Sequence, residues 1–344
     1  MHYWRYRQDF GVLKNMAGNT DSLFYGPVPS RRFGFSLGID LVPYKTCSFD
    51  CIYCQLGRTT NKTAERKRYK EISLDGFLSG LDEKIKNTGK IDYITFSGSG
   101  EPTLNSDIGT LIDAVKKVTT VPVAVLTNGS LLHREEVVQD LSNADLIKVS
   151  LDGCNEDIYK RINEPVESIT FENILNGIKM MLKNYTGRTW IEIMLLENIN
   201  DNLVCATEFK DILVENDIID RVEKIHINTP VRPSGFKEVS APLKENIQFF
   251  KDILNEQFFE NILGEKAEII SRFKQDNVAT EFSEKHKKLK ENIIELAKRR
   301  PVTAKDISFA LGVNINEVIK ILGPLLKRDE IRYKLHENIK YYYC

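Results

Sequence analysis

Three cysteines lie within eight residues of this 344-residue chain, at Cys47, Cys51 and Cys54. Their spacing lets one loop present all three thiols to a single metal centre. A cubane [4Fe-4S] cluster usually takes four protein ligands, so three local cysteines leave one iron open to a ligand from elsewhere. A zinc site with a fourth Cys or His, or a ferredoxin cluster closed by a distant cysteine, are the alternatives. We expect buried, unreactive thiols at the remaining cysteines, Cys154, Cys205 and Cys344.

The Cys-x3-Cys-x2-Cys motif, with Tyr53 directly before its last cysteine, resembles the cluster-binding loop of the radical SAM superfamily. The resemblance implies a [4Fe-4S] cluster on Cys47, Cys51 and Cys54, with the open iron chelated by the amino and carboxylate groups of S-adenosylmethionine (SAM). An electron donor of the ferredoxin or flavodoxin type would then drive cleavage of SAM to a 5'-deoxyadenosyl radical, which abstracts hydrogen from a substrate. The role of the protein is then to bind and orient the cofactors and the substrate, and to keep water and oxygen away from the radical.

A glycine-containing turn, SGSGEPTLN, follows the next predicted strand. Its glycines let backbone groups approach a ligand closely, although glycine turns after strands are commonly only turns. The turn resembles the superfamily element that contacts the SAM amino group, which assigns Gly98, Gly100 and Glu101 to cofactor binding. Ser99 stands where that element has its first glycine.

Polar residues end the two strands that follow, at Asn128 and at Ser150 and Asp152. By the same resemblance, Ser150 and Asp152 match the segment that hydrogen-bonds the ribose of SAM, and Asn128 is a neighbour of SAM. Turn chemistry before Gly129 and Gly153 is the alternative for Asn128 and Asp152. The segment 192–196 matches the strand that packs against adenine, and core packing explains it equally well.

The run from Tyr25 to Asp40, which contains Arg31 and Arg32, resembles iron-sulfur oxidoreductases related to the enzymes that build wybutosine-type bases in tRNA. The two arginines could neutralise a phosphate or carboxylate, or form salt bridges at the barrel rim. Residues 1–46 contain no cysteine, whereas the archaeal tricyclic-base enzymes carry a second cluster there. The resemblance therefore implies the radical SAM mechanism for this chain, and it does not imply the wybutosine reaction.

Short apolar runs alternate with amphipathic segments over residues 34–229, which predicts repeated βα units around a parallel sheet. We expect a partial (β/α)6 barrel, with a doubly wound sheet as the alternative; in both, ligands collect at the carboxyl ends of the strands. The predicted strands are Gly34–Leu41, Asp92–Ser97, Val121–Thr127, Leu146–Leu151, Trp190–Leu195 and Val222–Asn228. The predicted helices are Leu74–Lys86, Ile108–Val118, Glu135–Leu141, Phe171–Leu182 and Leu203–Val214.

The chain length predicts more than one domain. We expect an N-terminal extension at 1–24, the radical SAM barrel at 25–235, a helical connector or cap at 236–284, and a winged helix-turn-helix at 285–344. The last module is predicted from helices Lys288–Lys298, Thr303–Leu311 and Asn316–Lys327, then two β-like runs, Ile331–Leu335 and Ile339–Tyr343. An apolar fraction of 42% excludes wholesale disorder. Without an apolar spanning segment or signal peptide, we expect a cytoplasmic protein.

Residues 285–344 carry 14 Lys and Arg against 7 Asp and Glu, which leaves 34 against 42 in residues 1–284. The end of the chain is therefore at +7 and the rest at −8. This asymmetry suggests a polyanion partner such as RNA, although a solvated basic face is an equally common cause. Phosphates would meet Lys285, Lys287, Lys288, Lys290, Lys298, Arg299, Arg300, Arg332 and Lys334. Gly323 and Pro324 are expected to interrupt the supposed recognition helix.

The leading hypothesis is a radical SAM enzyme that modifies RNA, with tRNA as the substrate. Radical modification of a protein or peptide is the second hypothesis, and an iron-sulfur regulator that binds DNA is the third. The SGSGEP turn and the Val149–Asp152 segment favour the enzymes, because a sensor needs no SAM pocket. The sequence identifies no catalytic base and no atom of attack.

Overall fold

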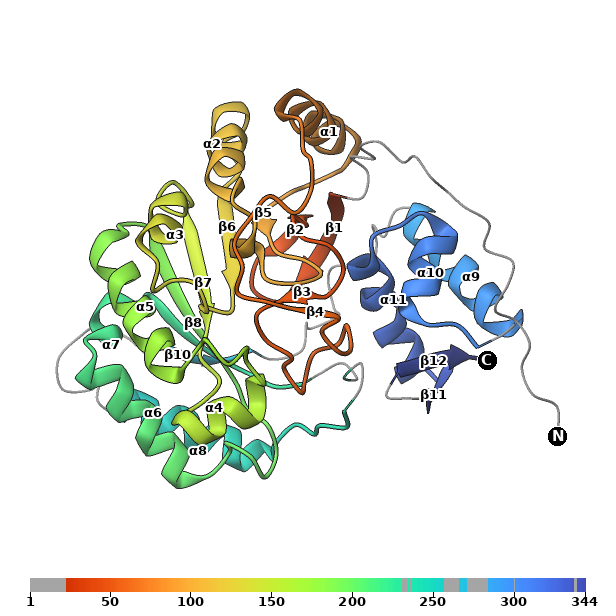
Figure 1. Ribbon diagram of the computed structural model, residues 1–344. Helices are drawn as coiled ribbons and strands as arrows, with labels where there is room; N and C mark the ends of the chain where they lie inside the picture. Colours follow the sequence, from red (N-terminus) through yellow and green to blue (C-terminus); the bar gives the residue numbers. More distant parts are fainter. Residues whose placement is uncertain are drawn as a thin grey trace.

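The computed structural model describes residues 23–230, 234, 237–256, 266–270, 284–299, 301–336 and 339–344. Within these residues, an eight-stranded sheet runs in the order β1-β2-β5-β6-β7-β8-β9-β10 (Figure 1). Most of the predicted N-terminal extension lies outside the described residues, and its last residue, Phe24, already belongs to the sheet. No helix of the described part has the length and apolar character needed to cross a bilayer.

All six predicted strands are present and lie parallel to one another. They are β2 (Gly34–Ile39), β5 (Tyr93–Phe96), β6 (Val123–Thr127), β7 (Leu146–Ser150), β8 (Arg188–Met194) and β9 (Lys224–Asn228). Two further strands extend the sheet at its edges: β1 (Phe24–Ser30), antiparallel to β2, and β10 (Ala267–Ile269), parallel to β9. Within the expected helical connector or cap at 236–284, α8 (Lys244–Glu256) is a helix as expected. The expectation is wrong for β10, whose three residues are too few to show a periodic pattern.

The five predicted barrel helices are also confirmed, and two short ones join them. The helices are α1 (Leu74–Asn87), α2 (Ile108–Val118), α3 (Glu135–Asp140), α4 (Glu156–Asn163), α5 (Phe171–Asn184), α6 (Leu203–Glu215) and α7 (Ile218–Arg221). Local capping sets several of their starts. Thr170 accepts from the backbone of Asn173 at the start of α5 while the Asn173 side chain accepts from Thr170, which satisfies donors that the first turn leaves unpaired.

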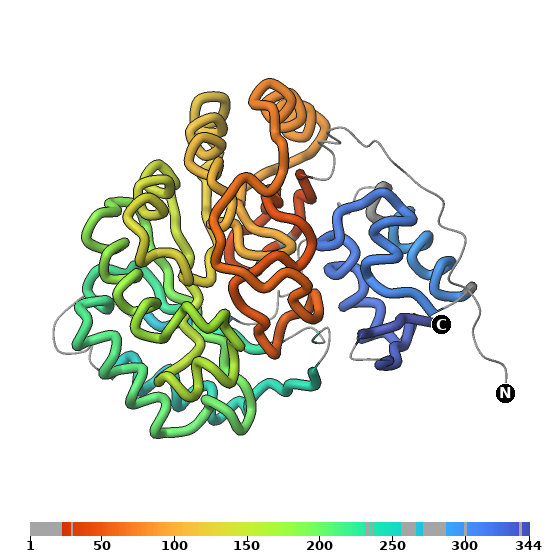
Figure 2. The backbone as a smooth tube through the Cα atoms, viewed as in Figure 1, coloured from red at the N-terminus to blue at the C-terminus, as the bar shows by residue number. Residues whose placement is uncertain are grey.

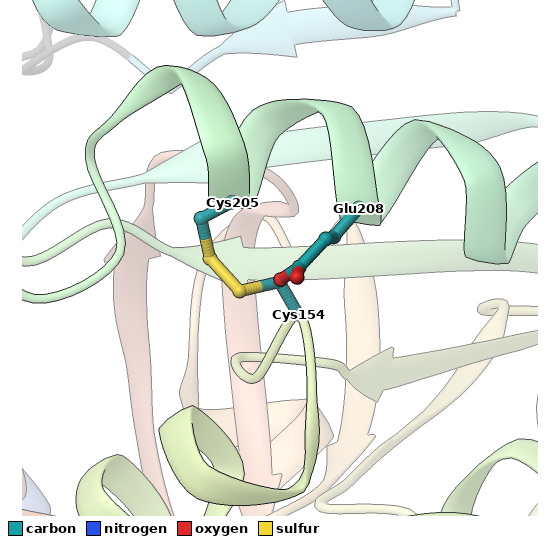
Figure 3. A group of neighbouring side chains, drawn as sticks. All are labelled: Cys154, Cys205 and Glu208. Carbon is teal, nitrogen blue, oxygen red and sulfur yellow. A yellow bond between two sulfur atoms is a disulfide. The ribbon is translucent and has the colours of Figure 1, made fainter.

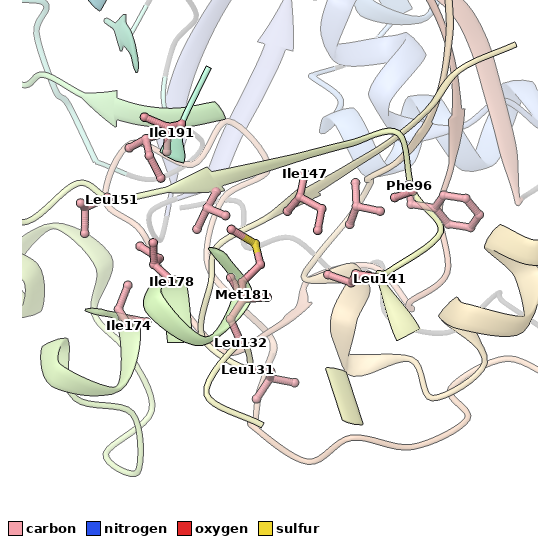
Figure 4. Close-up of a cluster of buried hydrophobic side chains, with 14 of the residues drawn as sticks. Phe96, Leu131, Leu132, Leu141, Ile147, Leu151, Ile174, Ile178, Met181 and Ile191 are labelled. Carbon is pink, nitrogen blue, oxygen red and sulfur yellow. The ribbon is translucent and has the colours of Figure 1, made fainter. Parts of the chain in front are cut away.

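The main core lies between one face of the sheet and the helices. Ile147 and Ile191 project from their strands toward Ile178 and Met181 of α5 (Figure 4). Among the described residues, the opposite face carries a smaller apolar cluster of Phe33, Ala124, Leu146 and Trp190, together with polar side chains. Because the helices pack on a single face, the sheet is a partial barrel with an inner, polar face, and the doubly wound alternative is wrong.

The end of the chain forms a separate core from α9 (Glu284–Arg299), α10 (Ala304–Leu311), α11 (Ile315–Lys327), β11 (Arg332–His336) and β12 (Ile339–Tyr343). We call residues 284–344 the C-terminal module. Gly312 ends α10 with φ of +62°, a left-handed conformation that suits glycine. The expected interruption of α11 is wrong: the helix runs through Pro324, and the burial of Leu322 and Leu325 on either side offsets the cost of about 3 kcal/mol.

The C-terminal module packs beside the first edge of the sheet (Figures 1 and 2). Helix α11 contacts β1, where Glu317 accepts a hydrogen bond from the backbone of Gly26 at 2.7 Å. The Lys305 ammonium lies 5.3 Å from the ring centre of Tyr44, three residues before the first cysteine of the motif. The module therefore borders the cysteine loop.

Candidate functional site

The cysteine loop follows β2 and is held at both ends. Cys47 lies in a short strand, β3 (Thr46–Cys47), which pairs with β4 (Asn61–Lys62). Further along, the backbone N–H of Ile52 donates to the carbonyl of Ile162 in α4 at 2.9 Å. These bonds fix the three thiols at the carboxyl end of the strands, as the sequence predicts.

Each of the three thiols has a side-chain nitrogen donor beside it. Lys45 Nζ lies 3.2 Å from Cys54 Sγ, Asn163 Nδ2 lies 3.4 Å from Cys51 Sγ, and Asn128 Nδ2 lies 3.6 Å from Cys47 Sγ. A donor directed at sulfur stabilises a thiolate, which is the form that binds metal. The three cysteines are not in disulfides.

The surroundings of the thiols fit a metal cluster. Burial raises the pKa of Cys47 to about 12 and that of Cys51 well above its ordinary value, so thiolates here need a cation in contact with them. In the described part of the chain, the only three candidate ligand atoms within 4.8 Å of one another belong to Cys154, Cys205 and Glu208. The thiols of the loop are thus spread more widely than one tetrahedral zinc ion needs, since a Zn–S bond of about 2.3 Å implies sulfurs about 3.8 Å apart. The donor set fits a multi-iron cluster better than a zinc ion.

Glu101 lies in the turn after β5 and is buried, with 2% of its surface exposed. Its Oε1 accepts from the backbone and hydroxyl of Thr103 and from the hydroxyl of Thr127, and its Oε2 accepts from the backbone of Asn128 at 2.8 Å. Burial outweighs these bonds and raises the pKa of Glu101 above its usual range. Oε2, with one donor, keeps capacity for a further donor.

The two glycines of this turn serve a close approach between loops. A Cβ at Gly100 would lie 1.8 Å from the carbonyl oxygen of Thr46, and one at Gly98 would lie 2.3 Å from the carboxyl carbon of Asp40. The backbone of Glu101 in turn donates to the Thr46 carbonyl at 3.1 Å. The glycines therefore bring the Glu101 turn onto the cysteine loop.

Asp152 and Tyr53 meet at the end of β7. The Tyr53 hydroxyl donates to Asp152 Oδ2 at 2.6 Å, Asn163 donates to the same oxygen at 3.0 Å, and the Met194 backbone donates to Oδ1 at 2.9 Å. Asp152 is thus engaged on both oxygens. The Ser150 hydroxyl, by contrast, makes no hydrogen bond within the described part of the chain, and Ser150 pairs with Glu192 across the strands.

All of the predicted site residues lie on the cysteine loop or at adjacent strand ends, and each of them except Gly98, Gly100 and Ser150 takes part in one of the hydrogen bonds above. Sequence reasoning missed Lys45 and Asn163. Lys45 stands two residues before Cys47, which is a usable signal, whereas Asn163 lies 112 positions from Cys51 and reaches it only through the fold of α4. It also missed Lys148, which bonds Glu192 inside the barrel at 2.6 Å.

The remaining cysteines differ from expectation. Cys154 and Cys205 form a disulfide between the loop after β7 and α6, with Glu208 beside it (Figure 3). Both are buried as expected, but they are paired, because the fold brings together residues 51 positions apart. Cys344 is exposed, so the expectation that it is buried is wrong.

Comparison with known proteins gives consistent matches. The family model described as "Radical SAM superfamily" matches residues 41–207. A UPF0026 protein of Methanocaldococcus jannaschii is 33% identical over 94% of this chain and 95% of its own length. A Brachyspira hyodysenteriae protein named "GTPase Obg" is 34% identical over 92% of this chain, which spans only 44% of that longer protein.

More distant matches name specific reactions. A Thermotoga petrophila protein, "Probable dual-specificity RNA methyltransferase RlmN", is 26% identical over 62% of this chain and 60% of its own length. A Petrotoga mobilis "GTP 3',8-cyclase" is 27% identical over half of each chain. Among solved structures, Streptococcus suis SuiB aligns with a TM-score of 0.50 at 14% identity, over 72% of this chain and 54% of its own, which shows the fold alone.

Proposed function

We propose that this chain, which belongs to the radical SAM superfamily and aligns over nearly its full length with a UPF0026 protein, modifies RNA, with tRNA as its substrate. The chain is a radical SAM enzyme with a [4Fe-4S] cluster and SAM as cofactors. When bound, they supply one-electron, hydrogen-abstracting chemistry, for which the enzyme needs an electron donor. A ferredoxin or flavodoxin is the proposed donor.

Cys47, Cys51 and Cys54 are the proposed cluster ligands. Each sulfur lies within 3.6 Å of a nitrogen donor, and these donors stabilise the deprotonated thiols that iron requires. The buried ammonium of Lys45 adds a positive charge beside Cys54, since Lys45 is only 2% exposed. These residues would hold the cluster through the three thiolates.

Glu101, Ser150 and Asp152 are the proposed contacts of SAM. Glu101 Oε2, with one protein donor, is placed to accept from the ammonium group of SAM. Ser150 offers an uncommitted hydroxyl for the ribose, and Tyr53 and Asn163 orient Asp152 beside it. Asn128 connects these elements, because its backbone bonds Glu101 while its side chain lies by Cys47.

The charge of the C-terminal module carries the RNA proposal: residues 285–344 are at +7 and lie next to the cysteine loop. Lys287, Lys288 and Lys334 are exposed cations of this module. Three other expected phosphate contacts pair with carboxylates, Lys290 with Glu330, Lys298 with Glu295 and Arg332 with Asp329. The side chains of Lys285, Arg299 and Arg300 lie outside the described residues. The likeness to an RNA methyltransferase supports the same substrate class.

The winged-helix assignment of this module and the relation to wybutosine-synthesis enzymes are parts of the proposal. Three helices and an antiparallel hairpin support the first. The position of α11 disfavours a regulator that binds DNA. Glu317 of α11 is buried and accepts a hydrogen bond from the backbone of Gly26 in β1, so the start of this helix cannot enter a major groove.

The test compares tRNA nucleosides, by mass spectrometry, from strains that carry the wild-type protein, Cys51→Ala or Cys344→Ser. We expect one modified nucleoside to be absent with Cys51→Ala and retained with Cys344→Ser, whose thiol is exposed and outside the cysteine loop. An unchanged nucleoside profile overturns the RNA assignment. A difference confined to tryptic peptides would move the substrate to a protein.

A further inference from the structure

Asn163, the last residue of α4, bonds two parts of the candidate site through one side-chain nitrogen. Its Nδ2 donates to Cys51 Sγ at 3.4 Å and to Asp152 Oδ2 at 3.0 Å. A side-chain amide nitrogen carries two hydrogens, so one can be directed at the sulfur and the other at the carboxylate. A proposed cluster ligand and a proposed SAM contact therefore share one donor group.

The end of α4 is fixed to the cysteine loop on both sides of Cys51. The backbone N–H of Asp50 donates to the Asn163 carbonyl at 2.9 Å, and that of Ile52 donates to the Ile162 carbonyl at 2.9 Å. The Ile162 side chain is fully buried in an apolar cluster that also contains Ile52. These backbone bonds and this packing set the position of the Asn163 side chain beside Cys51.

The carboxylate of Asp152 is held by three donors from three elements. Tyr53 of the cysteine loop and Asn163 of α4 donate to Oδ2, and the backbone of Met194 in β8 donates to Oδ1. The orientation of this proposed ribose contact therefore depends on α4 as well as on the loop.

The two bonds of Asn163 are shielded from water. Asn163 and Asp152 are each 2% exposed. A hydrogen bond is stronger in such surroundings than in water, and solvent does not replace a donor that a buried acceptor loses. Removal of the amide thus leaves both the sulfur and the carboxylate short of a donor.

A hydrogen bond to a cluster sulfur also has an electronic effect. It favours the state with more negative charge on the sulfur, which is the reduced state, and so raises the reduction potential. Lys45 and Asn128 lie beside the other two thiols, but the second acceptor of Asn128 Nδ2 is the Ser48 hydroxyl. Among these three side chains, Asn163 is the one whose nitrogen also bonds a proposed SAM contact.

We propose that Asn163 is a positioning residue that raises the reduction potential of the cluster through Cys51 and holds Asp152 in place for SAM. The inference rests on the proposed cluster ligands and SAM contacts. It goes beyond them, because it gives one side chain control over both electron uptake and SAM binding. Reductive cleavage of SAM requires an electron and bound SAM together, so this amide connects two requirements of the reaction.

The test uses the full chain, reconstituted anaerobically, and measures two quantities other than turnover. A redox titration without SAM, followed by electron paramagnetic resonance, gives the reduction potential, and equilibrium dialysis gives the affinity for SAM. Asn163→Leu keeps the approximate shape of the side chain and removes its donors. We expect the ratio of reduced to oxidised cluster at a fixed potential to fall about tenfold, which is about 59 mV for a one-electron couple. We also expect SAM to bind about tenfold more weakly.

Three further variants separate the two effects from a loss of stability. Tyr53→Phe removes the other side-chain donor to Asp152 and leaves Asn163 beside Cys51, so SAM should bind more weakly without the shift in potential. Asn163→Ser keeps one donor hydrogen and should show smaller shifts in the same directions as Asn163→Leu. Asn255→Leu is the matched control, because Asn255 is also buried and bonds the backbone of Ala267 outside the candidate site. It should change neither quantity.

A wild-type potential or a wild-type SAM affinity in Asn163→Leu would overturn the proposal, and so would equal shifts in Asn255→Leu. Failure of both Asn163 variants to take up iron would also overturn it, because Asn163 would then serve only to hold the loop. Wild-type protein that binds neither the cluster nor SAM would contradict the proposed cofactor site, and the inference with it. The two kinds of failure are distinguishable, and neither measurement needs RNA.

Discussion

Tyr53 donates its phenol hydrogen to Asp152 Oδ2 at 2.6 Å, and this bond ties the cysteine loop to the end of β7. The two residues are 99 positions apart in the sequence. Burial raises the pKa of both groups, so the hydrogen bond lies in an environment shielded from water. Through it, the position of a proposed ribose contact depends on the loop that carries the thiols.

Tyr53→Phe removes this bond and leaves the rest of the ring. We expect SAM to bind about tenfold more weakly and the protein to lose about 1–2 kcal/mol of stability, because a buried carboxylate loses a donor. Anaerobic titration of SAM and thermal unfolding measure the two effects. Tyr69→Phe is the control, since its hydroxyl bonds the Glu65 carbonyl in an exposed position. Equal behaviour of the two variants contradicts this account.

The disulfide of Cys154 and Cys205 predicts a definite count of thiols. Denatured, metal-free protein should react with iodoacetamide at four cysteines, namely Cys47, Cys51, Cys54 and Cys344, and at all six only after reduction. Mass spectrometry of the peptides reads the pattern directly. Alkylation of Cys154 and Cys205 without a reductant would show that the two thiols are free.

His226 should make stability depend on pH. Burial lowers the pKa of His226 to about 4, against about 6.5 in an unfolded chain. Between these two pH values, the side chain is protonated in the unfolded chain and neutral in the folded protein. The free energy of unfolding is therefore highest above pH 6.5 and decreases as the pH is lowered, by on the order of 2 kcal/mol from pH 7 to pH 5. Chemical denaturation of His226→Gln should show a flatter profile, whereas exposed His336→Gln should follow the wild type. Parallel profiles for all three proteins would contradict the assignment.

Glu317 should help to dock the C-terminal module on the barrel. Removing its carboxylate in Glu317→Ala leaves the Gly26 N–H without its partner, for an expected loss of about 1–3 kcal/mol. Hydrogen exchange at the Gly26 amide should accelerate in this variant. Glu330→Ala removes a partly exposed partner of Lys290 and serves as the control. Unchanged exchange at Gly26 in Glu317→Ala would show that the contact does not persist in solution.

Periodicity predicted the fold well where elements are long and have one apolar face. The six central strands and five barrel helices repeat that pattern, and the helix boundaries agree to within two residues. The edge strand β10 escaped prediction because it has only three residues and depends on β9 for its pairing. The continuity of α11 through Pro324 escaped because tertiary burial overrode a local breaker.

The residues of the candidate site that lie on one loop or at one strand end were predictable from the sequence. Cys47, Cys51 and Cys54 are adjacent in sequence, and Glu101 stands in a recognisable turn. Asn163 and the Lys148–Glu192 pair were not predictable, because they join segments 44 or more positions apart through the closure of the barrel. The pairing of Cys154 with Cys205 has the same origin.

The central claim is that Cys47, Cys51 and Cys54 support reductive cleavage of SAM, and one measurement tests it most directly. Anaerobically reconstituted protein is incubated with dithionite and SAM, and 5'-deoxyadenosine is quantified by chromatography. We predict that the wild type and Cys344→Ser form 5'-deoxyadenosine, whereas Cys51→Ala forms none. Absence of 5'-deoxyadenosine from cluster-loaded wild type, or equal formation by Cys51→Ala, would contradict the claim.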